Sequence, residues 1–128
     1  MADALFDTTV FIDYYRGDRS AQALIDAVLE GSLRGSFSAL TTFEIWIGIS
    51  SHEEEVDYLG IMHPFEELAL TASMARTAAG WLRNLPGRAS EALIRDALIA
   101  ATAAEHGETI YTRNVADFER FYRNVQTY

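Results

Sequence analysis

The stretch that decides the fold of this 128-residue sequence is Ala4-Leu5-Phe6-Asp7-Thr8-Thr9. Residues 4–6 form a short apolar run, which is typical of a buried strand, and the run stops at the acidic Asp7. We read residues 8–15 as a helix that starts on the two threonines. A strand that leads directly into a helix is the first half of a crossover between parallel strands. The stretch therefore predicts a protein of the α/β class.

The same alternation of apolar runs and helical periods continues along the chain. We expect further helices over residues 21–29, 41–49, 53–62, 71–85 and 90–106. Further strand candidates are residues 35–39, 65–70, 109–112 and 124–127. Strands that alternate with helices form a parallel sheet through right-handed crossovers. The sequence thus predicts a three-layer α/β/α sandwich with a parallel sheet of four to five short strands. In such sheets the ligand crevice lies beyond the carboxyl ends of the strands.

Length and composition fit a single globular domain. Hydrophobic residues make up 49 % of the chain and charged residues 23 %, and no linker or internal repeat interrupts it. We therefore read residues 1–128 as one domain. No apolar run is long enough to span a membrane, and the start of the chain lacks the basic region of a secretory signal. We expect a cytoplasmic protein with no membrane partner.

The absence of two residue types excludes several kinds of chemistry. Without cysteine the chain has no disulfide, no thiolate nucleophile and no zinc–thiolate site. All ten basic residues are arginines, and the missing lysine excludes Schiff-base chemistry, a Walker A phosphate loop and a receiver-type signalling site. Thr9 stands where a haloacid-dehalogenase-like phosphatase needs a second aspartate. Because the net charge is −9, a phosphate-bearing substrate must be met by local arginines, metal ions or a basic partner.

Four of the 19 acidic residues occupy positions that a solvated surface charge does not explain. Asp7 and Asp117 each follow a predicted strand, although either residue also suits the N-cap of the next helix. Glu44 lies on a largely apolar helix face, unless the helix tilts and lets its side chain reach water. Asp96 has only apolar neighbours one helical turn away, and the adjacent Arg95 is expected to point elsewhere on the helix. An ionised carboxylate buried without a partner is very costly, so these acids need an explanation.

The four acids can meet in one place. Asp7 and Asp117 lie beyond the carboxyl ends of strands, while Glu44 and Asp96 lie on helix faces that should pack on the same sheet. Four carboxylates in one crevice repel one another unless protons or cations neutralise them. Oxygen-only ligands select hard ions such as Mg²⁺ or Mn²⁺, and a pair of such ions serves in-line phosphoryl displacement. The acids therefore indicate a metal site that acts on phosphate esters.

Four segments carry a resemblance to a known family. They are residues 5–13, residues 41–48 with a glutamate and then a glycine four positions later, residues 96–103, and Thr112-Arg113-Asn114-Val115-Ala116-Asp117-Phe118. In order and spacing these segments resemble the PIN-domain family, most closely the VapC-type toxins of VapBC toxin–antitoxin modules. The last two segments together are quite specific. One position departs from the pattern, since Thr9 stands where many relatives have serine or asparagine.

The resemblance implies a PIN fold and a metal-dependent endoribonuclease. The positions that match the four acids of the family are Asp7, Glu44, Asp96 and Asp117. Its polar motif residues match Thr8, Thr9, Thr112 and Asn114, which we expect to orient carboxylates or metal-bound water. Toxins of this kind form homodimers and are held inactive by an antitoxin. We therefore expect a homodimer with a cognate antitoxin as its partner.

The same resemblance sets the expected mechanism. The ligands that we expect for Mg²⁺ or Mn²⁺ are Asp7, Asp96 and Asp117. Glu44 would bind a second ion or a metal-bound water, and water rather than a side chain would attack the RNA phosphodiester. We expect Arg113 and Arg16 to position the RNA, and a basic antitoxin segment to dock in the same acidic groove. The alternative is a non-catalytic PIN-like module that binds RNA or a partner without cutting.

Overall fold

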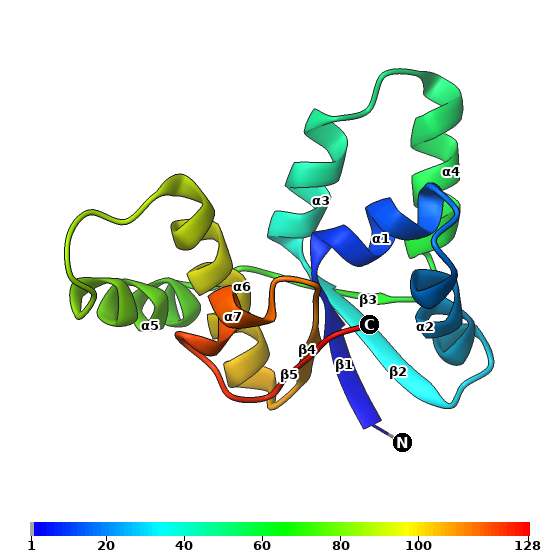
Figure 1. The fold of residues 1–128 in the computed structure, drawn as a ribbon. Helices are drawn as coiled ribbons and strands as arrows, with labels where there is room; N and C mark the ends of the chain where they lie inside the picture. The colour runs from blue at the N-terminus through cyan, green and yellow to red at the C-terminus, as the bar shows by residue number, and fades with distance from the viewer. Residues whose placement is uncertain (1) are drawn as a thin grey trace.

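The computed structural model describes residues 2–128, which contain a parallel sheet of five strands (Figure 1). The strands are β1 (Ala2–Phe6), β2 (Leu33–Ser38), β3 (Glu66–Leu68), β4 (Thr109–Tyr111) and β5 (Val125–Gln126). They are ordered β3-β2-β1-β4-β5, and every neighbouring pair is parallel. The predicted parallel sheet of short strands is confirmed.

Seven helices connect the strands in the described part of the chain. They are α1 (Thr8–Tyr15), α2 (Arg19–Leu29), α3 (Ala39–Ile47), α4 (His52–Met62), α5 (Ala72–Arg83), α6 (Glu91–His106) and α7 (Val115–Glu119). Helix α2 starts earlier than predicted, because the Asp18 side chain caps it by accepting the backbone N–H of Ala21 at 2.9 Å. None of the helices within residues 2–128 combines the length and the apolar character that crossing a membrane requires.

Alternate residues of the central strand β1 point to opposite faces of the sheet and into separate cores. Ala4 and Phe6 belong to a cluster built with residues of α1, α2 and α4, whereas Leu5 belongs to a cluster built with residues of α6. All three side chains are fully buried. A strand that is buried on both faces has a continuous apolar sequence, as residues 4–6 do. Helices on both faces complete the predicted three-layer α/β/α sandwich (Figure 1).

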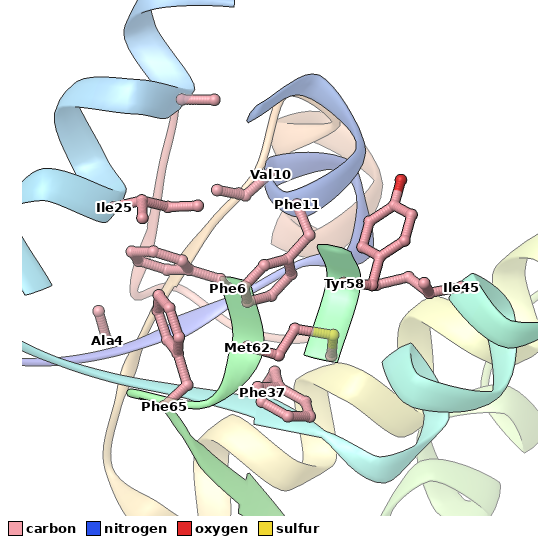
Figure 2. Packing of buried hydrophobic residues seen from close by; sticks show 11 residues of the cluster. Ala4, Phe6, Val10, Phe11, Ile25, Phe37, Ile45, Tyr58, Met62 and Phe65 are labelled. Carbon is pink, nitrogen blue, oxygen red and sulfur yellow. The ribbon is translucent and has the colours of Figure 1, made fainter. Parts of the chain in front are cut away.

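The core beneath α1 is an interlocked set of aromatic rings (Figure 2). The ring centroid of Phe6 lies 6.0 Å from that of Phe11 and 5.4 Å from that of Phe65. Phe65 also meets Phe11 edge-on at 5.1 Å. Tilted and edge-on pairs of this kind add about 0.5–1.5 kcal/mol each beyond the burial of their area. This core fixes α1 on the sheet and thereby places Asp7, the residue that precedes the helix.

Gly35 in strand β2 makes this aromatic packing possible. It is buried, and a Cβ atom added there would lie 2.6 Å from the ring of Phe65 and 2.9 Å from the side chain of Val28. These distances are far below van der Waals contact, so a larger residue would force the ring to move. The missing side chain at Gly35 therefore lets Phe65 lie directly on the strand.

The order in which strands are added to the sheet reverses at β1, with β2 on one side of it and β4 on the other. Strands β1, β2 and β3 follow one another outward, and the chain then returns to place β4 and β5 on the other side of β1. In a parallel sheet such a switch point opens a crevice at the carboxyl ends of the strands. The backbone N–H of Asp7 donates to the carbonyl oxygen of Tyr111 at 3.1 Å and joins the two strand ends. Residues that follow β1 and β4 therefore share this crevice.

Glu108 is a buried acid at the amino end of β4, on the opposite end of the sheet from the crevice. The Ser36 Oγ lies 3.0 and 2.9 Å from the two carboxyl oxygens of Glu108 and 3.1 Å from the carbonyl oxygen of Ala4. A hydroxyl has one hydrogen, so Ser36 cannot donate to both acceptors when Glu108 is ionised. Burial raises the pKa of Glu108, against the lowering effect of the Ser36 hydrogen bond. A protonated Glu108 would donate to Ser36, which could then donate to Ala4.

Glu108→Gln should stabilise the protein at pH 8 by about 1 kcal/mol, the net value of a typical hydrogen bond, and should have little effect at pH 4. An acid whose pKa is raised by folding stabilises most below its ordinary pKa, and this contribution is lost as the pH rises through the folded pKa. Glutamine resembles the protonated acid at every pH, since its amide donates to Ser36. Urea unfolding at both pH values measures the difference. A gain as large at pH 4 as at pH 8 would contradict the protonation argument.

Candidate active site

Asp7 lies at the carboxyl end of β1 and is buried among hydrogen-bond donors. Its Oδ1 accepts the backbone N–H of Thr8 at 2.8 Å, so the residue caps α1. Its Oδ2 accepts the hydroxyls of Thr9 at 3.1 Å and Thr112 at 2.9 Å. Burial raises the pKa of Asp7, while these three hydrogen bonds act in the opposite direction. The two interpretations of Asp7, as a helix cap and as a site carboxylate, are therefore compatible.

Asp96 lies on α6 and is only 4 % exposed. Burial raises its pKa to about 6, and the negative charge of Asp7 adds to the rise. Arg95 supplies a nearby cation, since its Nε lies 3.8 Å from Oδ1 of Asp96. The expectation that Arg95 points elsewhere on the helix is wrong, because its long side chain folds back beside the neighbouring carboxylate. The raised pKa shows that this cation does not fully offset the cost of the buried charge.

Glu44 lies on α3, and its charge also raises the pKa of Asp96. Its side chain is 18 % exposed, and both of its carboxyl oxygens are engaged. Oε1 accepts the hydroxyl of Thr8 at 2.7 Å, and Oε2 lies 2.9 Å from Nη1 of Arg95. The expected apolar surroundings are wrong for one neighbour, because Ile47 is 70 % exposed. Glu44 is therefore a partnered carboxylate at the rim of the crevice, and not an isolated buried charge.

Asp117 lies in the first turn of α7. The interpretation of Asp117 as the N-cap is wrong, because the helix begins earlier and Asn114 occupies the cap position. The residue is exposed, and it lines a cavity of about 140 Å³ together with Asp96 and Arg120. Its charge contributes to the raised pKa of Asp96. Asp117 thus approaches the other acids from the solvent side.

The polar residues singled out by the resemblance surround these carboxylates: Thr8, Thr9, Thr112 and Asn114. The backbone N–H of Asn114 donates to the hydroxyl of Thr112 at 3.0 Å, which in turn donates to Asp7. A hydroxyl that donates to a carboxylate favours its charged form and fixes its orientation. The threonines donate directly to the acids, whereas Asn114 contacts Thr112 and acts on Asp7 only through it.

The two arginines that we expect to contact RNA differ in their surroundings. Arg16 is exposed and lines a cavity of about 440 Å³ together with Glu44. Arg113 is engaged within the protein: its Nη2 lies 2.9 Å from each carboxyl oxygen of Asp18, and its guanidinium lies 4.5 Å from the centre of the Tyr128 ring. Both arginines are exposed, and an RNA-binding role for either residue stays a prediction.

Two sets of contacts near the site escape sequence reasoning. The first is the ion pair between Arg95 and Glu44, for which the only signal is that a buried acid on an apolar helix needs a cation. The second is a network in which the Tyr128 hydroxyl donates to Asp13 at 2.6 Å and Asp13 pairs with Arg113 at 3.5 Å. Its members come from opposite ends of the chain, so no local pattern predicts it.

The four acids act on one another electrostatically, but their side chains are not arranged as the ligands of one metal ion. Within residues 2–128, no three histidine, aspartate or glutamate side chains are arranged to hold one ion together. The donor set nevertheless fits Mg²⁺ or Mn²⁺, because it consists of carboxylate oxygens and because a cation would relieve the repulsion that raises the pKa of Asp96. Binding would require the carboxylates to turn toward one another. A site of this chemistry suits the displacement of phosphate esters.

Fold and site together define an α/β protein with acids gathered at the switch point of a parallel sheet. The PIN domain family model matches residues 4–124 of the sequence. The chain therefore belongs to the PIN-domain family, and the resemblance predicted from its motifs is confirmed.

Solved structures of similar fold include several toxin–antitoxin assemblies. A toxin–antitoxin complex from Klebsiella pneumoniae is 26 % identical, with a TM-score of 0.78 over 97 % of this chain and 96 % of that chain. DNA-bound VapBC from Salmonella typhimurium is 20 % identical, with a TM-score of 0.78 and coverages of 99 % and 98 %. VapBC2 from Rickettsia felis, bound to a promoter DNA fragment, is 16 % identical, with a TM-score of 0.76 and coverages of 98 % and 98 %. No curated protein matches significantly. These neighbours are consistent with a PIN toxin of the VapC type.

Proposed function

We propose that this protein is a Mg²⁺- or Mn²⁺-dependent endoribonuclease that acts as the toxin of a toxin–antitoxin pair. One observation carries the proposal: Arg95 contacts both Glu44 and the buried Asp96, and Asp117 lines the same cavity as Asp96. PIN domains are generally nucleases, and family membership therefore supports a hydrolase. The divalent ion and the RNA substrate are the parts of the proposal that experiments must test.

The residues that would hold the ion are Asp7, Asp96 and Asp117. A bound Mg²⁺ or Mn²⁺ lowers the pKa of water and offsets the charge of a phosphate. The chain contributes the fixed arrangement, because Thr9 and Thr112 both donate to Asp7 and hold its carboxylate in place. With their hydroxyl hydrogens committed in this way, these threonines support the acids and do not act as nucleophiles.

RNA would bind weakly and in a salt-sensitive manner. The net charge of −9 opposes a polyanion, so the phosphates must be met by individual arginines. Of the two expected contacts, Arg16 lines the same cavity as Glu44. Arg113 would first have to leave Asp18.

We further propose a cognate antitoxin as the protein partner. The Klebsiella pneumoniae neighbour is a toxin–antitoxin complex, and the Salmonella typhimurium neighbour is a DNA-bound VapBC assembly. The acid cluster and the net charge favour a basic antitoxin segment in the same groove. A homodimer completes the proposal on the strength of the family resemblance. A single domain over residues 1–128 and a cytoplasmic location are proposed from the length and composition of the chain.

The alternative is a non-catalytic PIN-like module that binds RNA or a partner without cutting. One observation favours it, since no three acids within the described residues are arranged to hold one ion. All four acids expected for the family are nevertheless present, and for this reason we prefer the nuclease. Calorimetric titration with Mn²⁺ separates the two candidates, because only the nuclease requires the ion.

The purified protein, freed of any partner, should cleave RNA only when Mg²⁺ or Mn²⁺ is added. Asp7→Asn should lower the rate about a hundredfold or more, equivalent to roughly 3 kcal/mol at the transition state. The fold should survive, because asparagine caps helices as well as aspartate does. The products should carry 5′-phosphate and 3′-hydroxyl ends, since water attacks the phosphorus, and mass spectrometry reads these ends directly.

Three results would count against this proposal. A 2′,3′-cyclic phosphate on the products would identify the ribose hydroxyl as the nucleophile and would exclude the mechanism. Equal cleavage by the wild type and by Asp7→Asn would indicate a contaminating nuclease or a misplaced site. Cleavage of no RNA, together with no Mn²⁺ binding, would favour the binding module.

A further inference from the structure

Arg95 brings a positive charge into the acid cluster, and neither the motifs nor the family resemblance gives it a role. Its Nη1 lies 2.9 Å from Oε2 of Glu44, and its Nε lies 3.8 Å from Oδ1 of Asp96. Its charge lowers the pKa of Asp96 and that of Asp7. One side chain therefore contacts two of the acids and acts electrostatically on a third.

Glu44 holds the Arg95 side chain in position through an ion pair. One of its oxygens accepts the hydroxyl of Thr8 at 2.7 Å and the other pairs with Arg95, so both are used within the protein. Charge-assisted pairs of carboxylate and guanidinium are among the stronger polar contacts in proteins. A carboxylate engaged in this way has less to offer an incoming metal ion than Asp96, whose ion contact to Arg95 is longer.

Part of the Arg95 side chain is exposed to solvent. Its side chain is 41 % exposed, and it lines a groove of about 550 Å³ between α3 and α6, together with Glu44 and Phe43. The contacts to the acids are made by Nη1 and Nε, and the exposed part of the side chain borders the groove. A polymer that crosses the acid cluster by way of this groove would pass the Arg95 side chain.

We propose that Arg95 contacts the RNA phosphate in the site and that Glu44 is a positioning residue that holds Arg95 there, rather than a ligand for a second metal ion. The inference rests on the proposed ribonuclease function. A guanidinium N–H donates to a phosphate oxygen and stabilises negative charge that develops there. The assignment also explains how a chain of net charge −9 presents a cation to a polyanion beside its acids.

The phosphate contact is tested without any metal ion, by the binding of a fluorescent single-stranded RNA in EDTA over a series of salt concentrations. Arg95→Gln should reduce the slope of log affinity against log salt by about 0.7, the loss expected for one phosphate contact on a single strand. Arg34→Gln is the matched control, because this substitution removes the same charge. Arg34 is exposed and pairs with Asp3 at 3.5 Å, at the other end of the sheet. Equal slopes for Arg95→Gln and Arg34→Gln would overturn the inference.

Single-turnover cleavage and Mn²⁺ calorimetry test the positioning role of Glu44. Arg95→Gln and Glu44→Gln should each slow the cleavage step about a hundredfold, as the loss of a donor to developing charge does, and Arg95→Lys should recover part of the rate. The double variant should be little worse than either single variant, since the two residues act as one unit. Neither single substitution should weaken Mn²⁺ binding.

The possible failures are distinguishable. Loss of Mn²⁺ affinity in Glu44→Gln, but not in Arg95→Gln, would make Glu44 a metal ligand and would overturn the inference. A wild type that cleaves no RNA would refute the proposed function by that result alone. The salt slopes in EDTA would still decide whether Arg95 meets a phosphate.

Discussion

The Asp96→Asn protein should be more stable than the wild type at pH 7.5 and should cleave RNA about a thousandfold more slowly, equivalent to roughly 4 kcal/mol at the transition state. Burial and the charge of Asp7 raise the pKa of Asp96 from 3.8 to about 6. Above that pH the folded protein holds a charge that the unfolded chain keeps in water. A difference of about two pKa units corresponds to about 3 kcal/mol of lost stability, which asparagine should restore in large part.

The pH dependence makes this prediction specific. The stability that comes from a raised carboxyl pKa is present at low pH and is lost as the pH rises from 3.8 through about 6. The gain in Asp96→Asn should therefore be largest at pH 7.5 and should shrink toward pH 4, where the wild type is also protonated. Urea unfolding in EDTA measures it, and the exposed Asp26→Asn on α2 controls for the change in net charge. A loss of stability at pH 7.5 would mark Asp96 as a structural carboxylate held by Arg95.

Gly35→Val should destabilise the fold by about 3 kcal/mol or more, at the upper end of the cost of overpacking a core. The new side chain would start 2.6 Å from the ring of Phe65 and 2.9 Å from Val28, where no space exists. The ring cannot retreat freely, because it also packs against Phe6 and Phe11 (Figure 2). The midpoint of urea unfolding reads this loss.

A second substitution locates the cause of that loss. Phe65→Leu should restore part of the stability in the Gly35→Val background, although it destabilises the wild type, because it removes the overlapping ring atoms. Gly80→Ala on α5 is the control, since its nearest neighbour would be 3.8 Å away. It should raise stability by about 1 kcal/mol through helix propensity. If Gly35→Val has the same midpoint of urea unfolding as the wild type, the close packing of Phe65 on β2 is refuted.

Local sequence patterns predicted the architecture because each element has its own periodic signature. The apolar run at residues 4–6 is buried on both faces, and the helical periods of α2 and α6 reappear with small shifts at their ends. The gathering of the acids was predictable for a different reason. In a parallel sheet every carboxyl end lies at the same edge, so Asp7 and Asp117 were expected at one edge once strands were assigned before them.

What the sequence did not reveal depends on side chains that reach across the fold. The direction of Arg95 is set by Glu44 on another helix, and the engagement of Arg113 is set by Asp18 and Tyr128. The start of α7 was misplaced because Asn114 and Asp117 are both good helix starters and only the packing decides between them. The largely apolar helix face predicted around Glu44 includes Ile47, which is exposed in the structure.

The hydrogen bond from Thr112 to Asp7 spans 105 positions of the chain, and this separation has a consequence for the synthesis of the protein. Residues 7 and 44 are synthesised before residues 96–117. The acids can meet only after β4 has docked on β1, a non-local pairing that forms late. Under the proposed function, a nascent chain therefore has no assembled site with which to cut RNA. The order of the strands thus makes assembly of the acid cluster depend on the last third of the chain.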